Sequence, residues 1–261
     1  MFNPKTVVTS VALAALIMSV ATAAQAAESA QAPAAYSNAA VANPNFDLST
    51  GAAIIDHDAK AIISGTATVP IGNSFGAQLD GSEALGEGLN RGGLAGHIFY
   101  RDPSKYLLGA TAMWSRVGSD DITRVGPEAE GYWGDFTARL AGGWQSDDDD
   151  DTGYINTRLS YYVTDNIVVA AGAGAFSNNR SAGLDAEWQP DAVPFSVFAA
   201  AGDTNESDGY GILGVRLPLG SQGVTLKDRQ RRYDPPNIVE SFTTGESGSI
   251  QKQSKSVPPP I

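Results

Sequence analysis

The stretch Tyr106–Val117 reads YLLGATAMWSRV, and its residues alternate between two kinds. Every second residue from Tyr106 to Trp114 is apolar, whereas the positions between them include Gly109, Thr111 and Ser115. Successive side chains of a β-strand point to opposite sides of the sheet. The stretch therefore predicts a strand with one apolar face and one more polar face.

The same period of two recurs at residues 122–133, 135–145, 153–163 and 181–188. Between about residue 51 and residue 219 the sequence has no run of helical periodicity and almost no helix-capping pattern. We therefore expect an all-β fold whose strands occupy residues 50–220.

The aromatic residues distinguish two all-β architectures. Tyr106 and Trp114 are eight residues apart on one face, as are Phe136 and Trp144. Eight residues of a tilted strand span roughly 20 Å, which approaches the ~25 Å apolar band of an outer-membrane barrel with aromatic residues at both boundaries. A soluble periplasmic β-sandwich, the alternative, would gather its aromatic residues at mid-strand. The spacing favours a transmembrane antiparallel up-and-down β-barrel.

The connections between the expected strands give the strand count. Short connections mostly alternate with long ones, for example 72–73, 102–104 and 164–165 against 81–91, 146–152 and 202–208. Outer-membrane barrels have short periplasmic turns and longer extracellular loops. The alternation predicts twelve strands, with ten as the fallback, and places both ends of the barrel chain on the periplasmic side.

The residues before the barrel have the pattern of an export signal. Lys5, the apolar run 7–20 and the sequence Ala24-Gln25-Ala26 predict a cleavable secretory signal peptide over residues 1–26. The apolar run is too short to supply the ~20 residues of a transmembrane helix. Residues 27–49 are rich in Ala, Ser and Pro and predict a flexible linker.

Composition excludes several classes of protein. The chain has 29 Asp+Glu against 17 Lys+Arg, a net charge of −12 and no cysteine. Dispersed basic residues on an acidic chain argue against nucleic-acid binding. The chain has only two histidines, His57 and His97, and neither has a serine at a convincing local spacing. These observations argue against an enzyme, and we predict no catalytic residue, no cofactor and no metal site.

Three blocks of the sequence resemble a known group of proteins. Val69–Gly81, His97–Pro103 and Arg229–Pro236 are similar to porin-type outer-membrane β-barrel proteins of Gram-negative bacteria, most of them uncharacterised. The resemblance covers roughly residues 50–240. It implies location in the cell outer membrane, contact with lipid and lipopolysaccharide, and insertion by the barrel-assembly machinery. Such chains often end on a strand with a closing aromatic residue, whereas this chain ends Pro258-Pro259-Pro260-Ile261.

Charged residues on the polar faces of the expected strands are candidates for lining the lumen. They are Arg124, Glu128, Glu130, Arg139, Arg158, Asp185, Glu187, Arg216 and His97. Opposed charges along a pore would orient small polar solutes. The alternative is a salt-bridged interior that only stabilises the barrel, since twelve strands lie between filled and water-conducting barrels. We favour a small porin-like channel for small solutes over a non-conducting structural or surface-interaction barrel.

Acidic residues are expected at the outer rim. Asp80, Glu83 and Glu87 are assigned there with Asp120, Asp121, Asp203, Glu206 and Asp208, and such a rim would favour cations. The run Asp147–Asp151 could bind Ca²⁺, but it lacks the spacing of an EF-hand loop, and a solvated loop is the preferred interpretation.

The sequence after the barrel has a different character. Residues 221–261 carry a basic cluster and a Pro235-Pro236 pair, and they predict a disordered periplasmic tail. A plug of tail residues inside the lumen is the alternative, because acidic lumen residues would attract the basic cluster.

Overall fold

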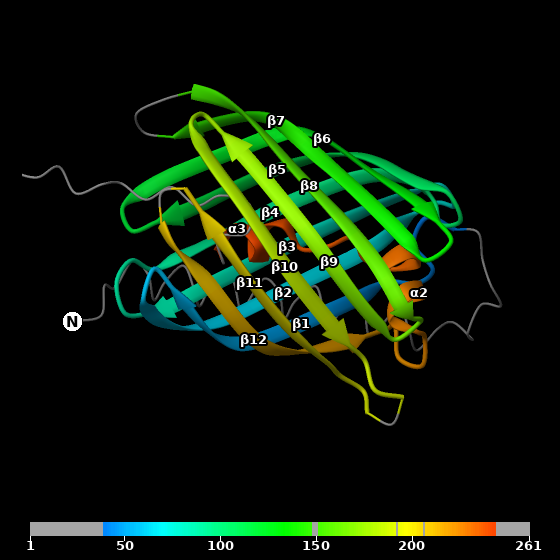
Figure 1. Ribbon diagram of the computed structural model, residues 1–261. Coiled ribbons are helices and arrows are strands. Elements are labelled where there is room, and N and C mark those ends of the chain that lie inside the picture. The colour runs from blue at the N-terminus through cyan, green and yellow to red at the C-terminus, as the bar shows by residue number, and fades with distance from the viewer. Residues whose placement is uncertain (1–38, 148–150, 192, 206, 244–261) are drawn as a thin grey trace, which may run out of the picture.

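Twelve antiparallel strands form a closed barrel (Figure 1). The computed structural model describes residues 39–147, 151–191, 193–205 and 207–243. The strands are β1 (Asn45–Ile55), β2 (Asp58–Ile71), β3 (Phe75–Gly86), β4 (Arg91–Asp102), β5 (Tyr106–Val117), β6 (Asp120–Trp133), β7 (Phe136–Asp147), β8 (Asp151–Thr164), β9 (Ile167–Phe176), β10 (Asn179–Trp188), β11 (Ser196–Thr204) and β12 (Ser207–Leu219). Each strand pairs with its neighbours in sequence, and β1 also pairs with β12, so the sheet has no free edge. The predicted fold and strand count are confirmed.

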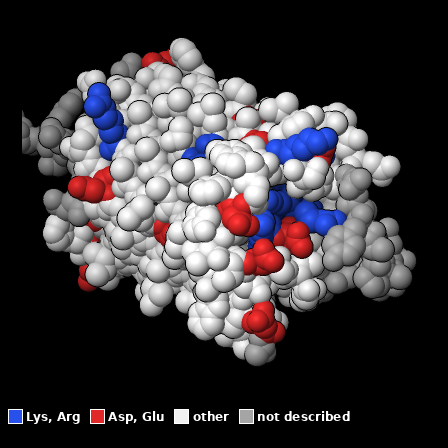
Figure 2. Space-filling view, turned by 45° about the vertical axis from the view of Figure 1, so that its right-hand side comes forward, with Lys and Arg blue, Asp and Glu red and all other residues white. Residues whose placement is uncertain are grey.

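The outer wall of the barrel is apolar. In β5, Leu108 is 54% exposed while the preceding Leu107 is fully buried, as the alternation in this strand predicts. Large apolar side chains lie outside on most strands, among them Ile54, Ile63, Ile98, Leu140, Leu159, Leu184 and Leu213. Figure 2 shows a broad surface with few charged side chains, a group of basic and acidic side chains toward its right-hand side and single ones near its left-hand and upper edges. Because so much exposed apolar surface is unfavourable in water, this wall fits contact with lipid.

The two ends of the barrel are called proximal and distal, according to where its first strand begins and its last strand ends. The proximal end holds the start of β1 and the end of β12, and the distal end holds the β1–β2 turn. A girdle of outward aromatic residues rings part of the proximal end: Phe75, Tyr100, Tyr106, Trp133, Phe136 and Tyr161. Toward the distal end, Trp144 is also exposed. Aromatic residues therefore mark both boundaries of the wall, as their spacing predicts.

The predicted alternation of loop lengths is wrong, although it led to the correct strand count. Turns at both ends are short, and the longest connection, residues 189–195, lies at the proximal end. β3 continues to Gly86 and β12 begins at Ser207, so most of the expected loops 81–91 and 202–208 belong to strands. A barrel interior accepts polar side chains, so polar composition here marks a strand as readily as a loop.

The predicted boundary of the barrel is also corrected. β1 begins at Asn45, inside the predicted linker 27–49, because residues from Asn45 onward pair with both β2 and β12. Before it, Ala40 and Val41 are buried. Residues 27–38 of the predicted linker and the predicted signal peptide 1–26 lie outside the described residues. None of the described helices is long and apolar enough to cross a membrane.

A disordered periplasmic tail was expected over residues 221–261, but residues 221–243 pack into the proximal mouth and the lumen of the barrel. They contain α2 (Leu226–Arg232), close to the proximal end, and α3 (Ile238–Thr243), deeper in the lumen (Figure 1). The disordered-tail prediction is wrong for this stretch because its polar sequence hides Leu226, Val239 and Phe242, all fully buried. The alternative of a plug is confirmed, and residues 221–243 are named the plug below.

Candidate functional site

The plug is fastened to the proximal end by α2. Thr225 caps the helix by accepting from the amide of Asp228 at 3.2 Å. Lys227 forms an ion pair of 2.8 Å with Asp135 in the β6–β7 turn. Arg231 donates to main-chain carbonyls of the same turn, including that of Gly134 at 3.0 Å. These contacts hold one side of α2 against the rim.

A second segment shares the proximal mouth with α2. The amide of Ala42 donates to the carbonyl of Arg232 at 2.8 Å, and Arg101 donates to the carbonyl of Ala40 at 3.1 Å. Val41 packs with inward-facing Phe99 and with Leu107 and Tyr132. Two stretches of chain, one from before β1 and one from after β12, therefore pack together in the proximal mouth.

Beyond α2 the plug runs along β3 toward the distal end. Gln78 donates to the carbonyl of Pro235 at 3.0 Å, and Asp80 accepts from the amide of Ile238 at 2.9 Å. The hydroxyls of Ser82 and Thr243 are 2.8 Å apart. Because residues 78, 80 and 82 are successive inward positions of β3, the plug advances steadily from the proximal toward the distal end.

The apolar side of α3 has a matching patch on the barrel wall. Val239 and Phe242 are fully buried against Ala95, Met113, Val117 and Ile122, which face the lumen from β4, β5 and β6. An apolar patch inside a barrel lumen would be exposed to water without a cover. This half of the wall and the plug therefore form a common hydrophobic core.

The structure places all nine predicted lumen residues on the inner face, and it joins four of them in one cluster. His97 lies between two carboxylates, 2.9 Å from Asp80 and 2.8 Å from Glu128. Arg139 is 2.9 Å from Glu128 and 3.6 Å from Glu130. These residues come from β3, β4, β6 and β7, where the plug rests.

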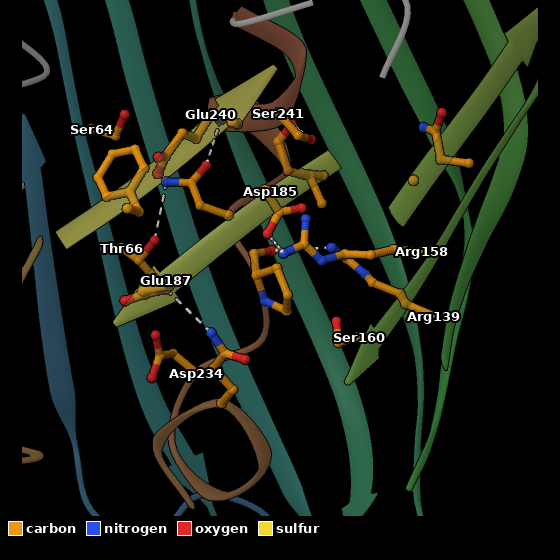
Figure 3. A pocket seen from close by; sticks show the side chains of 18 of the residues that line it. Ser64, Thr66, Arg139, Arg158, Ser160, Asp185, Glu187, Asp234, Glu240 and Ser241 are labelled. Atoms are coloured by element: carbon orange, nitrogen blue, oxygen red, sulfur yellow. Dashed lines mark hydrogen bonds and ion pairs between the residues drawn. The ribbon is translucent and has the colours of Figure 1, made fainter. Parts of the chain in front are cut away.

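A second cluster occupies the opposite wall and contains four more of the predicted residues. Arg158 pairs with Asp185 (Figure 3). Arg216 donates to Glu187 at 3.2 Å. The ninth predicted residue, Arg124, lies apart from both clusters. It donates to Gln145 at 2.7 Å, and its guanidinium is 5.0 Å from the ring centroid of Phe242.

The plug contributes charges of its own to the second cluster. Arg229 donates to Glu187 from the proximal side. Glu240 accepts from Arg216 at 3.1 Å and from Ser49 at 3.3 Å. Each wall charge in this cluster therefore has a partner of opposite sign, either on a neighbouring strand or on the plug, as buried charges require.

A cavity of about 180 Å³ lies between the plug and the inner wall of the barrel. Its lining comes from the plug and from most strands, namely β1, β2, β5 and β6 as well as β7 to β12. Arg139, Arg158, Asp185 and Glu187 are among the charged residues that line it (Figure 3), and apolar side chains of β11 and β12 line it as well. The plug thus leaves a narrow space of mixed polar and apolar character inside the lumen.

Two of the residues assigned to the outer rim are buried. Asp80 is fully buried in the lumen, and Glu83, near the distal end of β3, is 6% exposed. The error comes from the assumed loop 81–91, whereas the alternation of Gln78, Asp80 and Ser82 with Ala77, Leu79 and Gly81 signals an inward polar face. Sequence reasoning also missed Asp47, Asp234 and Glu240 as lumen groups.

The plug carboxyl groups respond to this environment. Burial raises the pKa of Asp234 well above its usual range, and the nearby carboxyl of Asp47 raises it further. Burial also raises the pKa of Glu240, against the opposing effect of Arg216. Protonation of these groups is therefore easier in the docked plug than in water.

Within the part of the chain that the structure describes, no group of three or more His, Cys, Asp or Glu side chains has the arrangement of a metal site. Residues 148–150 of the acidic run lie outside that part. The calcium alternative for this run stays a hypothesis.

Comparison with known proteins gives a fold. No protein-family model and no curated protein match this sequence. Among solved structures, the KdgM porin in complex with disordered oligogalacturonate matches with a TM-score of 0.53 at 10% identity, covering 66% of this chain and 98% of that chain. A second structure of the KdgM porin matches with a TM-score of 0.52 at 10% identity and the same coverage. With its closed sheet and apolar outer wall, the chain has the fold of a porin-type outer-membrane β-barrel.

Proposed function

We propose that this protein is a small porin-like channel, in which the plug narrows the lumen to the space between the plug and the barrel wall. The observation that carries the proposal is the cavity in this space, whose lining includes ion pairs. The alternative is a barrel whose interior only stabilises the fold. Such an interior would gain little from charged groups around an unfilled space, because buried ion pairs contribute little net stability. Small polar solutes and ions are the class that this space suits.

The lumen residues have defined roles in this proposal. Arg158 pairs with Asp185 and Arg216 with Glu187 at the cavity lining. Arg139 also lines the cavity and pairs there with Glu130. Such paired charges present both signs to a passing solute and would set its orientation and the ion selectivity. In this proposal no residue is catalytic and no cofactor takes part. The surrounding partners are outer-membrane lipid and lipopolysaccharide, with insertion by the barrel-assembly machinery.

The proposal is tested with the full chain in a planar lipid bilayer. We expect discrete conductance steps that are small for a twelve-stranded barrel, because the plug occupies part of the lumen. A chain ending at residue 220 should give larger steps. Absence of any steps from the full chain, with the barrel folded as shown by heat-modifiable gel mobility, would refute the channel and favour the alternative of a non-conducting structural or surface-interaction barrel. Steps of equal size from both chains would refute the role of the plug.

A further inference from the structure

One carboxylate of the plug lies in a site whose donors belong to the barrel wall. Nη2 of Arg216 donates to both carboxylate oxygens of Glu240, at 3.1 Å each, and the hydroxyl of Ser49 donates to one of them at 3.3 Å. Arg216 belongs to β12 and Ser49 to β1, whereas Glu240 belongs to α3. The wall therefore supplies the hydrogen-bond donors, and the plug supplies only the acceptor.

The two donors are positioned by the closure of the barrel. Ser49 and Arg216 are direct partners across the seam between β1 and β12. Ser49 is only 4% exposed, and Nη1 of Arg216 donates to Glu187 of β10 at 3.2 Å. A guanidinium with one fixed partner presents its remaining N–H groups in a fixed direction, which suits a carboxylate. The positions of both donors are therefore set by the wall and not by the plug.

This site opens into the cavity. Ser49, Arg216 and Glu240 all line the space between the plug and the wall. The side chains of Arg216 and Glu240 keep 21% and 13% of their surface exposed. A solute in the cavity therefore meets the ion pair between the wall and the plug.

The wall beside Arg216 is apolar on the distal side. The next inward position of β12 is Gly214, where a Cβ would lie 2.5 Å from the ring of Phe198. The guanidinium of Arg216 is 5.1 Å from the centroid of the same ring. Phe198, Ala200 and Ile212 continue the cavity lining from there. A guanidinium next to an apolar strip suits a carboxylate that carries a short apolar part.

We infer that Arg216 and Ser49 form a binding site for small carboxylates with a short apolar part, and that Glu240 of the plug occupies this site as a built-in competitor. The inference deepens the proposed function and rests on it, because it names a class of solute that the lumen takes. A solute carboxylate in the place of Glu240 keeps the charge at Arg216 balanced, since one negative charge replaces another.

Two other carboxyl groups, those of Asp47 and Asp234, also lie close enough to Arg216 to interact with its charge. Both would disfavour a further anion on their own. Glu240 nevertheless occupies the site in their presence, so they leave room for one carboxylate there.

Propionate serves as the probe, and its binding to the full chain in detergent micelles is titrated by saturation-transfer NMR. Glu240→Gln removes the competing carboxylate and keeps the size of the side chain. We expect this variant to bind propionate about tenfold to a hundredfold more tightly, the effect of a hydrogen bond to a charged group that no longer has to be broken. Propionamide, which has the same shape without the charge, should bind both chains alike. An unchanged affinity for propionate would overturn the inference.

A double variant separates an emptied site from a loosened plug. The gain in Glu240→Gln should vanish when Arg216→Gln is added, whereas Arg180→Gln, at the exposed distal end of β10, should preserve it. A gain that survives Arg216→Gln would come from extra space alone and would overturn the inference. Folding of each variant is checked by heat-modifiable gel mobility. Should Arg216→Gln not fold, Ser49→Ala replaces it, and propionate binding as tight as in Glu240→Gln alone would likewise overturn the inference.

The binding measurement does not require conduction, so the two proposals fail separately. Propionate binding without conductance steps in the bilayer would refute the channel and support the site. Conductance steps without propionate binding to Glu240→Gln would overturn the site and leave the channel standing.

Discussion

Replacing Phe242 by alanine should loosen the plug without disturbing the barrel wall. The Phe242 ring is fully buried against Met113, Val117 and Ile122, and it also lies against the guanidinium of Arg124. Truncation of a buried phenylalanine costs about 3–5 kcal/mol, because apolar contacts are lost and a cavity is left. Every 1.4 kcal/mol is a factor of ten in an equilibrium constant. The ratio of docked to undocked plug should therefore fall by about a hundredfold to a few thousandfold.

Hydrogen exchange of the plug amides measures this ratio directly, because exchange of a protected amide follows the free energy of local opening. We expect the amides of α3 to lose protection by that factor in Phe242→Ala, while the amides of β8 to β10 keep theirs. Phe195→Ala is the matched control, since Phe195 is exposed in the proximal β10–β11 connection. Unchanged protection of α3 in Phe242→Ala would refute the view that the apolar patch holds the plug.

Three further outcomes follow from the lumen and the wall. Because burial and Asp47 raise the pKa of Asp234 in the docked state, its contribution to docking is complete at low pH and is lost as the pH rises through that raised pKa; α3 protection measured against pH should fall accordingly, and Asp234→Asn should flatten the profile. Arg158→Gln should shift the reversal potential in a salt gradient toward cations and Asp185→Asn toward anions, and equal potentials in both would contradict their place in the permeation path. Leu184, 67% exposed in the middle of β10, should tolerate alanine, whereas Leu184→Arg should cost about 2–4 kcal/mol in unfolding from lipid vesicles, and a smaller loss would argue against lipid at this face.

The wall of the barrel was predictable because its signal is local. Tyr106–Trp114 and Phe136–Trp144 repeat a simple alternation, and each strand follows it whatever its partners are. The nine lumen residues follow from the same alternation. Once one side chain of a strand faces the lumen, every second side chain of that strand faces the lumen too. Which of them pair could not be predicted, because His97 meets Asp80 only through the register of β3 against β4.

The plug was predicted only as an alternative to a disordered tail, because the contacts that hold it are with residues far away in the sequence. Its helices are short, and in isolation such helices are unstable in water. Pro235 and Pro236 indicate an interrupted chain, and they gave no sign that their carbonyls accept hydrogen bonds from Gln78 and Arg139. The burial of Val239 and Phe242 could not be predicted, because it depends on the apolar patch that β4 to β6 form in the folded barrel.

The seam between β1 and β12 has a consequence for assembly. The plug follows β12 in the chain and enters beside β1, after the turn at Gly220. The apolar patch that holds α3 ends at Ile122, more than a hundred residues before α3, and the mouth through which the plug passes is bounded by both strands of the seam. The patch exists only where β4, β5 and β6 are paired, so α3 can dock only on a wall that has already formed around that patch.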